Sequence, residues 1–368
     1  MTFEERLAAI RAGMQAEKLD LLVAVHVAAH FIEPPDPALV LSGFKSLGPV
    51  AVLLDRSGGT LVVTPAWDVA RARATCPSLH VVAAHDVAEG LNTVLHGTSG
   101  ATIGLAGLAA SPWRIAKRLV DLMPQARAAD DIVFTAAGRK TDDELAHARE
   151  ATRIAELGYQ RLLEIARPGV SEDELAVEIR WHSKTLGAED NFLLLCAGPH
   201  NRAVAPSHGR LLQAGDIIVV EITPSYRGQL AQICRTIVLG EASAMLRDKY
   251  GLVIRAMEAG FAAAQPGAVM AQVCGAINAV LEAQGYGEFC HPPHIRRRGH
   301  GLGFGSVRPG DVALDNGTVL EPDMLFMIHP NQHLPETGYL LCGEPAVMTA
   351  TGAVPLTARQ AALAEIPL

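Results

Sequence analysis

The residues best suited to chemistry stand on one short stretch, VVEITPSYRGQLAQICRT, residues 219–236. Two apolar runs around a Pro-Ser-Tyr-Arg-Gly turn predict a pair of neighbouring strands. Glu221 lies on the first strand, and Gln232 and Cys234 lie on the second. A carboxylate, an amide and a thiol on one strand pair suit either a metal site with altered ligands or a pocket that orients a substrate.

Histidines are the second chemical feature. Seven of them stand in the second half of the chain: His200, His208, His291, His294, His300, His329 and His333. Imidazole titrates near neutrality, so it can move a proton from water to a leaving nitrogen. His300 lies in GHGLGFG, where the flanking glycines let the backbone approach closely and expose the ring. We expect four segments to bring polar groups onto one sheet face, namely 205–216, 221–236, 297–305 and 324–345.

The elements that must position these groups follow from the hydrophobic pattern. In the first half, strands expected at 19–25, 49–55, 60–65, 79–84 and 101–107 alternate with helices. That alternation predicts an α/β domain with a mixed sheet. In the second half, long helices precede the strand pair, and Ser171 with Glu174 forms the capping box of one of them. We predict an α+β domain there, with helices packed against one largely antiparallel sheet.

Composition limits the function. The chain has 368 residues, of which 49% are hydrophobic and 19% charged, with a formal net charge of -8 and a pI near 6.0. An acidic balance argues against a general nucleic-acid or membrane surface. No apolar run reaches the roughly 18 residues of a membrane helix, and the start of the chain is a charged amphipathic helix rather than a signal peptide. The six cysteines have no paired spacing, which favours reduced thiols and a cytoplasmic protein.

Taken in order along the chain, these segments resemble the creatinase/aminopeptidase P/prolidase family with its pita-bread fold. The resemblance rests on motifs listed in chain order: LVLSGF, LDRSGGTLVV, GRKTDDELAHAREA, RPGVSEDELAVEI, AGDIIVVEITPSYRGQLAQICRTIVLG, RGHGLGFG, VLEPDMLFMIHP and GEPAVMTATGAV. It implies a creatinase-like N-terminal α/β domain over residues 1–138 and a pita-bread catalytic domain over residues 139–368.

The metal ligands of that family do not carry over. There, two Asp, one His and two Glu hold two divalent ions that activate a bridging water. The matching positions here are Glu221, Gln232, His300, His329 and Gly343. Even with Glu344 one position further along, the carboxylates are too few to neutralise two dications in a buried site. We therefore predict no two-metal centre and no cofactor.

The family includes a metal-free branch of creatinase-like amidinohydrolases, in which a loop histidine is the general base and acid. His208 in PSHGR is the match, although the shorter loop leaves His200 as the alternative. The resemblance implies a hydrolase or lyase that cleaves a C–N bond of a small molecule. In that mechanism His208 shuttles protons, while Glu221, His300 and His329 orient substrate or water.

Creatine specificity is not expected. The glutamate that grips the guanidinium in creatinases falls on Cys234, so the pocket is less negative than theirs. An arginine from the run at 296–298 that pointed inward would indicate a substrate with a carboxylate, because Arg binds carboxylates through two hydrogen bonds. The residues predicted to bind substrate are Gln232, Cys234, Arg235, Arg298 and Glu344, and a structural role is the alternative for Arg235.

Two other functions stay open. One is a single-metal hydrolase of the Xaa-Pro peptidase type, with Glu221, His300 and His329 as ligands. The other is a binding protein without catalysis, because the pita-bread fold also serves non-enzymes. The resemblance further implies a homodimer in which the N-terminal domain of one subunit closes the site of the other. His26, His30 or Phe31 could then reach across.

Overall fold

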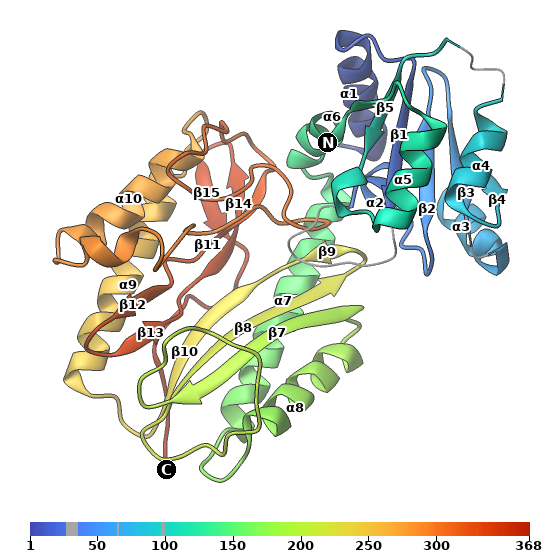
Figure 1. Ribbon diagram of the computed structural model, residues 1–368. Coiled ribbons are helices and arrows are strands. Elements are labelled where there is room, and N and C mark those ends of the chain that lie inside the picture. Colours follow the sequence, from blue (N-terminus) through green and yellow to red (C-terminus); the bar gives the residue numbers. More distant parts are fainter. Residues whose placement is uncertain (27–35, 65, 97–99) are drawn as a thin grey trace. The chain divides into compact units, whose positions relative to one another are not determined.

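The computed structural model describes residues 1–26, 36–64, 66–96 and 100–368. They form two compact units, Met1–Thr141 and Asp142–Leu368, each with its own sheets and helices (Figure 1). His30 and Phe31 lie outside the described residues. The cysteines are all buried free thiols. Among the described residues, no helix has the length and apolar character that a membrane crossing demands.

The first unit is built on a six-stranded sheet with the order β4-β3-β2-β1-β5-β6. Its strands are β1 (Leu21–His26), β2 (Val50–Leu54), β3 (Gly59–Val63), β4 (His80–Ala83), β5 (Ile103–Ala106) and β6 (Arg127–Ala128). Its α-helices are α1 (Phe3–Ala16), α2 (Pro37–Ser42), α3 (Val69–Thr75), α4 (Val87–Val94), α5 (Trp113–Leu122) and α6 (Asp130–Gly138). Strand β1 pairs antiparallel with β2 and parallel with β5. The prediction of an α/β domain with a mixed sheet is confirmed.

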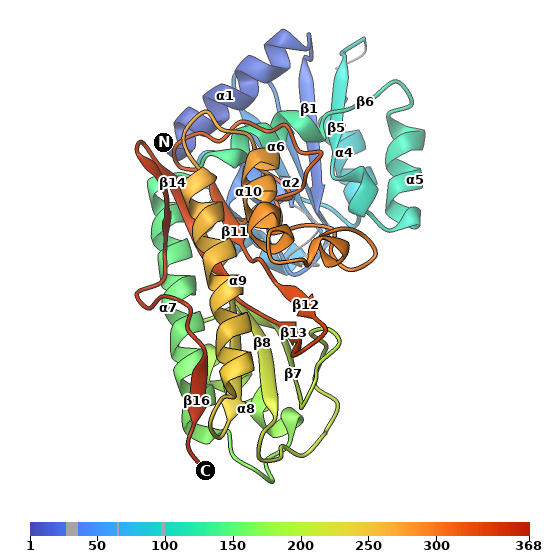
Figure 2. The ribbon, with the colours of Figure 1, turned by 90° about the vertical axis from the view of Figure 1, so that its left-hand side faces the viewer.

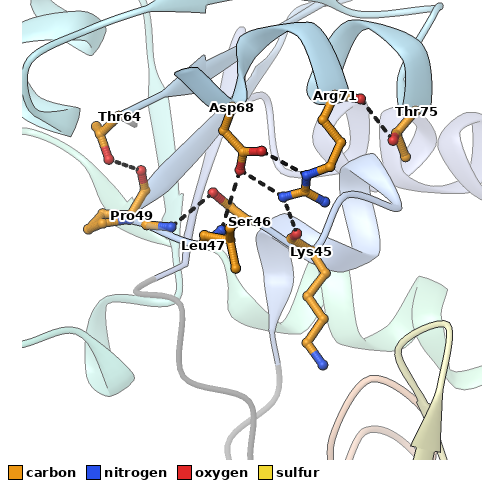
Figure 3. Close-up of polar contacts among 9 residues, drawn as sticks. Lys45, Ser46, Leu47, Pro49, Thr64, Asp68, Arg71 and Thr75 are labelled. Carbon is orange, nitrogen blue, oxygen red and sulfur yellow. Dashed lines mark hydrogen bonds and ion pairs between the residues drawn. The ribbon is translucent and has the colours of Figure 1, made fainter. Parts of the chain in front are cut away.

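An ion pair between buried Asp68 and half-exposed Arg71 holds the loop that follows α2 (Figure 3). Asp68 is almost completely buried and receives two hydrogen bonds of 2.7 Å from the guanidinium of Arg71. The Leu47 N–H donates to the same carboxylate, and Arg71 also donates to the Lys45 carbonyl while lying over the Phe44 ring. The Arg71 hydrogen bonds lower the pKa of Asp68, so this anchor is charged at neutral pH.

The second unit contains three sheets. Its largest has the order β16-β10-β8-β7, with β9 paired to β8, and the smaller ones are β11-β14-β15 and β12-β13. The strands are β7 (Asp190–Gly198), β8 (Ile217–Tyr226), β9 (Gln229–Leu230), β10 (Ile233–Leu239), β11 (Leu325–Ile328), β12 (Gln332–Leu334), β13 (Gly338–Leu340), β14 (Glu344–Thr349), β15 (Gly352–Pro355) and β16 (Ala364–Ile366). The expectation of one antiparallel sheet is therefore wrong in this respect, although isolated bridges such as Cys234 with Gly343 join the sheets.

Two pairs of helices surround these sheets. They are α7 (Asp142–Ile165), α8 (Glu172–Thr185), α9 (Ala244–Ala263) and α10 (Met270–Glu282). Figure 2 shows α9 and α10 side by side, and α9 packs on β11 and β15. The capping box at the start of α8 is confirmed, because Ser171 and Glu174 exchange side-chain to backbone hydrogen bonds.

Helices α7 and α8 cover one face of the large sheet. The core beneath them takes these residues from β8 and β10: Ile218, Val220, Ile222, Ile233, Ile237 and Leu239. Successive side chains on a strand point to opposite faces. Glu221 and Thr223 on β8, and Cys234 on β10, therefore point away from these helices. The sheet thus separates a core face from a face that carries polar groups.

Candidate functional site

Glu221 and Cys234 are direct cross-strand neighbours on the polar face. The register pairs them across β8 and β10, and the Cys234 thiol donates to Oε1 of Glu221 at 3.7 Å. Burial raises the pKa of the Cys234 thiol well above its usual value. The thiolate is therefore scarce at neutral pH, and Cys234 acts as a hydrogen-bond donor rather than as a nucleophile.

Asn331 is a member of the site that sequence reasoning missed. Its Nδ2 donates to Oε1 of Glu221 at 3.3 Å, and it is almost completely buried. Tyr339 on β13 was also missed, and its pKa is raised by burial and then by Glu221 and Cys234. The sequence feature that indicates Asn331 is its place in IHPNQH, two residues after the candidate site residue His329.

Burial raises the pKa of Glu221 to about 7. Hydrogen bonds from Cys234 and Asn331 and the charge of Arg297 act in the opposite direction and favour the ionised form. The result is a carboxyl group that can both give and take a proton near neutrality, which is what general acid–base catalysis needs.

His300 and Gln232 form a second polar pair next to this face. Nδ1 of His300 lies 2.9 Å from the Gly301 carbonyl, which can only accept, so this nitrogen carries a proton. Nε2 lies 3.1 Å from the Gln232 amide, whose other end contacts Thr223 Oγ1 at 3.2 Å. With the Gln232 oxygen toward the ring, His300 is an imidazolium; with the amide turned over, the ring is neutral and Thr223 donates to the amide.

His329 lies against His300, with ring centroids 5.4 Å apart. Burial lowers the pKa of His329 well below its usual value, and the neighbouring His300 lowers it further. Its Nδ1 is buried and has no hydrogen-bond partner among the described residues. His329 is therefore a neutral imidazole with an unused ring nitrogen.

Arg235 and Glu344 lie elsewhere than the sequence analysis expected. Arg235 points to the helix side of the sheet, over the Tyr159 ring of α7. Its Nη2 lies 2.9 Å from Oε1 of Glu344, and its Nη1 donates to the Gly343 and Cys234 carbonyls. Strand alternation is the physical reason, because a residue next to Cys234 must face the other way. We therefore assign this buried pair to stability, not to substrate.

Arg298 is inside the protein, as one of the arginine run was proposed to be, but it serves the backbone. Its Nε donates to Asn278 Oδ1 at 2.7 Å, and its Nη1 donates to the Asn331 carbonyl at 3.0 Å. These contacts make Arg298 a support for the 331 segment. Its Nη2 is buried without a hydrogen-bond partner among the described residues, so direct substrate binding by Arg298 stays a prediction. Arg297 forms an ion pair with Asp311 at 3.1 Å.

His208 lies on an exposed loop and contacts the start of α8. Its Nδ1 is 2.8 Å from Oε2 of Glu172, which is fully buried, whereas the His208 side chain is 66% exposed. Within the part of the chain that the structure describes, no hydrogen bond, ion pair or ring contact joins His208 to Glu221, His300 or His329. The alternative, His200, instead contacts the Pro335 carbonyl and the His333 ring.

The residues of the site do not fit the metals that the fold family implies. Among the described residues, no group of three or more His, Cys, Asp or Glu side chains is placed to hold a metal ion. Nε2 of His300 already faces Gln232, and Glu344 is paired with Arg235. Among the described residues at the matching ligand positions, Glu221 is left as the single carboxylate, so a pair of dications would lack counter-charge.

Gly343 provides independent support, because the structure leaves no room for a ligand side chain there. A Cβ at Gly343 would lie 2.6 Å from Cβ and 3.1 Å from Cα of His329. Real Cβ atoms do not approach so closely, and the His329 N–H donates to the Arg298 carbonyl, which holds the backbone of residue 329. Cβ and Cα of residue 329, together with the Met327 methyl, therefore occupy the space that a glutamate side chain at position 343 would need.

We expect Gly343→Ala to lower the free energy of unfolding by about 1–3 kcal/mol, the usual cost of overpacking. Urea denaturation followed by circular dichroism measures it. The matched control is Gly275→Ala in α10, where a Cβ meets nothing within 4 Å and where alanine favours the helix. Equal stability of Gly343→Ala and the unchanged protein would show that His329 moves aside easily.

Comparisons with known proteins agree with this architecture. The family model "Metallopeptidase family M24" matches residues 146–351. The Xaa-Pro dipeptidase of Pyrococcus furiosus is 24% identical over 333 residues, which cover 89% of this chain and 92% of that protein. The uncharacterized peptidase YqhT of Bacillus subtilis is 27% identical over 217 residues, and the match spans only 60% of YqhT.

Solved structures show the fold over almost the whole chain. The Xaa-Pro dipeptidase from Bacillus anthracis superposes with a TM-score of 0.86 at 20% identity, covering 99% of this chain and 100% of that one. The prolidase from Pyrococcus horikoshii gives 0.84 at 20% identity, covering 98% and 99%. The expected resemblance to the creatinase/aminopeptidase P/prolidase family and its pita-bread fold is thereby confirmed. Since the family model matches more than half of the 368 residues, this protein belongs to metallopeptidase family M24, a family of hydrolases.

Proposed function

We propose that this protein is a hydrolase that cleaves a C–N bond of a small molecule without a metal ion. The observation that carries the proposal is the position of Glu221 on the polar face, where Cys234 and Asn331 donate to its Oε1 and burial raises its pKa to about 7. The proposed substrates are amides and amidines, including dipeptides, because the relative from Pyrococcus furiosus is named an Xaa-Pro dipeptidase.

The chemistry needs one group that both takes and gives a proton. Ionised Glu221 takes a proton from water as the water oxygen bonds to the carbon of the C–N group. Protonated Glu221 then gives this proton to the nitrogen as the C–N bond breaks, so the carboxylate is regenerated. We give this role to Glu221 in place of His208, because Glu221 lies on the polar face and His208 pairs with Glu172.

The other polar groups bind and orient. Neutral His329 has an unused nitrogen that can accept a hydrogen bond from a substrate N–H or from water. The His300–Gln232–Thr223 row supplies donors and acceptors whose direction depends on the Gln232 amide. These roles agree with the expectation that His300, His329 and Gln232 contact the substrate, which stays a prediction.

We expect protein purified without chelator to contain far less than one zinc, iron or manganese ion per chain. Hydrolysis should also survive dialysis against EDTA. Elemental mass spectrometry and an assay with a panel of Xaa-Pro dipeptides, small amides and amidines test both. A manganese-dependent prolidase treated in parallel controls for chelator strength.

About one mole of metal per chain, with activity lost to EDTA, would instead favour the single-metal Xaa-Pro peptidase with Glu221, His300 and His329 as ligands. Tight ligand binding without turnover of any compound would favour a binding protein. Either result contradicts the proposal. The expected homodimer and the cytoplasmic location stay predictions.

A further inference from the structure

Asn331 is placed by three hydrogen bonds that leave it a single orientation. Its Oδ1 accepts from the Cys342 backbone N–H at 3.1 Å, and its carbonyl accepts from Arg298 Nη1 at 3.0 Å. Its Nδ2 then faces Oε1 of Glu221 at 3.3 Å. A backbone N–H can only donate, so the oxygen of Asn331 must face Cys342 and the NH₂ group must face Glu221.

The two oxygens of Glu221 are consequently unequal. Oε1 receives the amide of Asn331 and the thiol of Cys234. No hydrogen bond joins Oε2 to another residue of the described ranges, and the side chain is only partly buried. One oxygen is therefore anchored, and the other has no hydrogen-bond partner among the described residues.

We propose that Asn331 is a positioning residue that anchors Oε1 of Glu221, so that Oε2 is the oxygen that exchanges the proton with water and substrate. This inference rests on the proposed function, because it gives Glu221 the proton-transfer role. Asn331 acts only through Glu221 and does not touch the reacting atoms.

The surroundings of Asn331 and Glu221 are consistent with this role. Arg298 donates to Oδ1 of Asn278 and to the Asn331 carbonyl, and these two hydrogen bonds hold the backbone at residue 331. The titratable and charged groups that face Glu221 are Cys234 on β10, Tyr339 on β13 and Arg297 in the segment before the GHG motif. Arg297 and Tyr339 influence Glu221 through charge, whereas Cys234 and Asn331 form hydrogen bonds with it. Of these two donors, Asn331 is the one whose orientation is fixed by a further hydrogen bond, from Cys342.

The test is Asn331→Asp. It keeps the oxygen that accepts from Cys342 but replaces the donor to Glu221 by a carboxylate. A like charge at hydrogen-bond distance raises the pKa of one carboxyl by at least about one unit. We expect the Glu221 titration to move upward by that amount, and the acid limb of kcat/KM to move with it. Asn92→Asp on α4 is the control, because it adds the same charge at an exposed position.

The direct readout is the carboxyl carbon resonance of Glu221 in protein labelled with ¹³C-glutamate, assigned by its loss in Glu221→Gln. It needs no substrate, so it separates the two ideas. A shifted titration in a protein that hydrolyses nothing would support the anchor and refute the proposed function. Active protein whose Glu221 titrates alike with and without Asn331→Asp would refute the anchor.

A second variant guards against poor folding of the first. Asn331→Ala removes the donor without adding a charge, so it should raise the Glu221 pKa in the same direction by less. It should also lower kcat more than it raises KM, because a misplaced Oε2 affects proton transfer more than binding. An unchanged Glu221 titration in folded Asn331→Ala would likewise overturn the inference.

Discussion

Glu221→Gln should abolish most of the activity, with kcat reduced about 100- to 10,000-fold, the usual contribution of a general acid–base group. The amide keeps the shape of the side chain and its acceptor oxygen for Asn331 and Cys234, but it cannot take a proton. In the unchanged enzyme, kcat/KM should fall as the pH drops through about 7, because protonation of Glu221 removes the base. In Glu221→Gln, this acid limb should be absent from the residual activity.

The matched comparison is His208→Ala. Because His208 is exposed and contacts Glu172 instead of the polar face, we expect it to retain activity within about tenfold, below the range of an acid–base group. The opposite pattern, with a large loss in His208→Ala and a small one in Glu221→Gln, would return the proton-transfer role to the loop histidine. Steady-state kinetics on one substrate from the panel decide between the two residues.

Arg235→Met should destabilise the second unit by about 3–5 kcal/mol, the cost of leaving one partner of a buried ion pair unpaired. Both Arg235 and Glu344 are almost completely buried, with Nη2 2.9 Å from Oε1. The variant also removes the hydrogen bonds that tie the Cys234 and Gly343 carbonyls together. Urea denaturation with two probes, circular dichroism and tryptophan fluorescence, measures the change.

Two further variants show whether the loss belongs to the pair. Arg235→Met combined with Glu344→Leu should recover part of the stability, because no unpaired charge then remains in the interior. Arg161→Met on α7 breaks an exposed pair with Glu178 and should leave the urea midpoint almost unchanged. If Arg235→Met were as stable as Arg161→Met, Glu344 would have to be protonated in the folded protein.

Much of the fold was predictable because its signals are local. The alternation of apolar residues along 217–222 and 233–239 predicts two strands with one buried face, and the structure pairs Glu221 directly with Cys234. The same alternation predicts that Arg235 faces the helices, and the structure places it there, over Tyr159 and beside Glu344. This position favours the structural alternative for Arg235 over substrate binding.

The rest of the site depends on segments without a regular pattern. Asn331 and Tyr339 belong to the short strands and turns after β11. Asn331 accepts a hydrogen bond from the backbone of Cys342, across the β12–β13 hairpin. The Tyr339 N–H donates to the carbonyl of Asn201, which is far away in the sequence. His208 lies on the loop between β7 and β8. This loop is shorter than the family pattern implies, so the sequence alone did not fix where His208 lies. Hydrogen bonds of this kind cannot be deduced from periodicity, because they depend on the final packing.

The close contact between position 343 and residue 329 also limits redesign of the site. A side chain at position 343 would collide with Cβ and Cα of residue 329 and with the Met327 methyl. Because every residue other than glycine carries the same Cβ, exchanging His329 alone would not make room for a glutamate at 343. A site with more carboxylates on this face would therefore need a shift of the backbone between β11 and β14 in addition to new side chains.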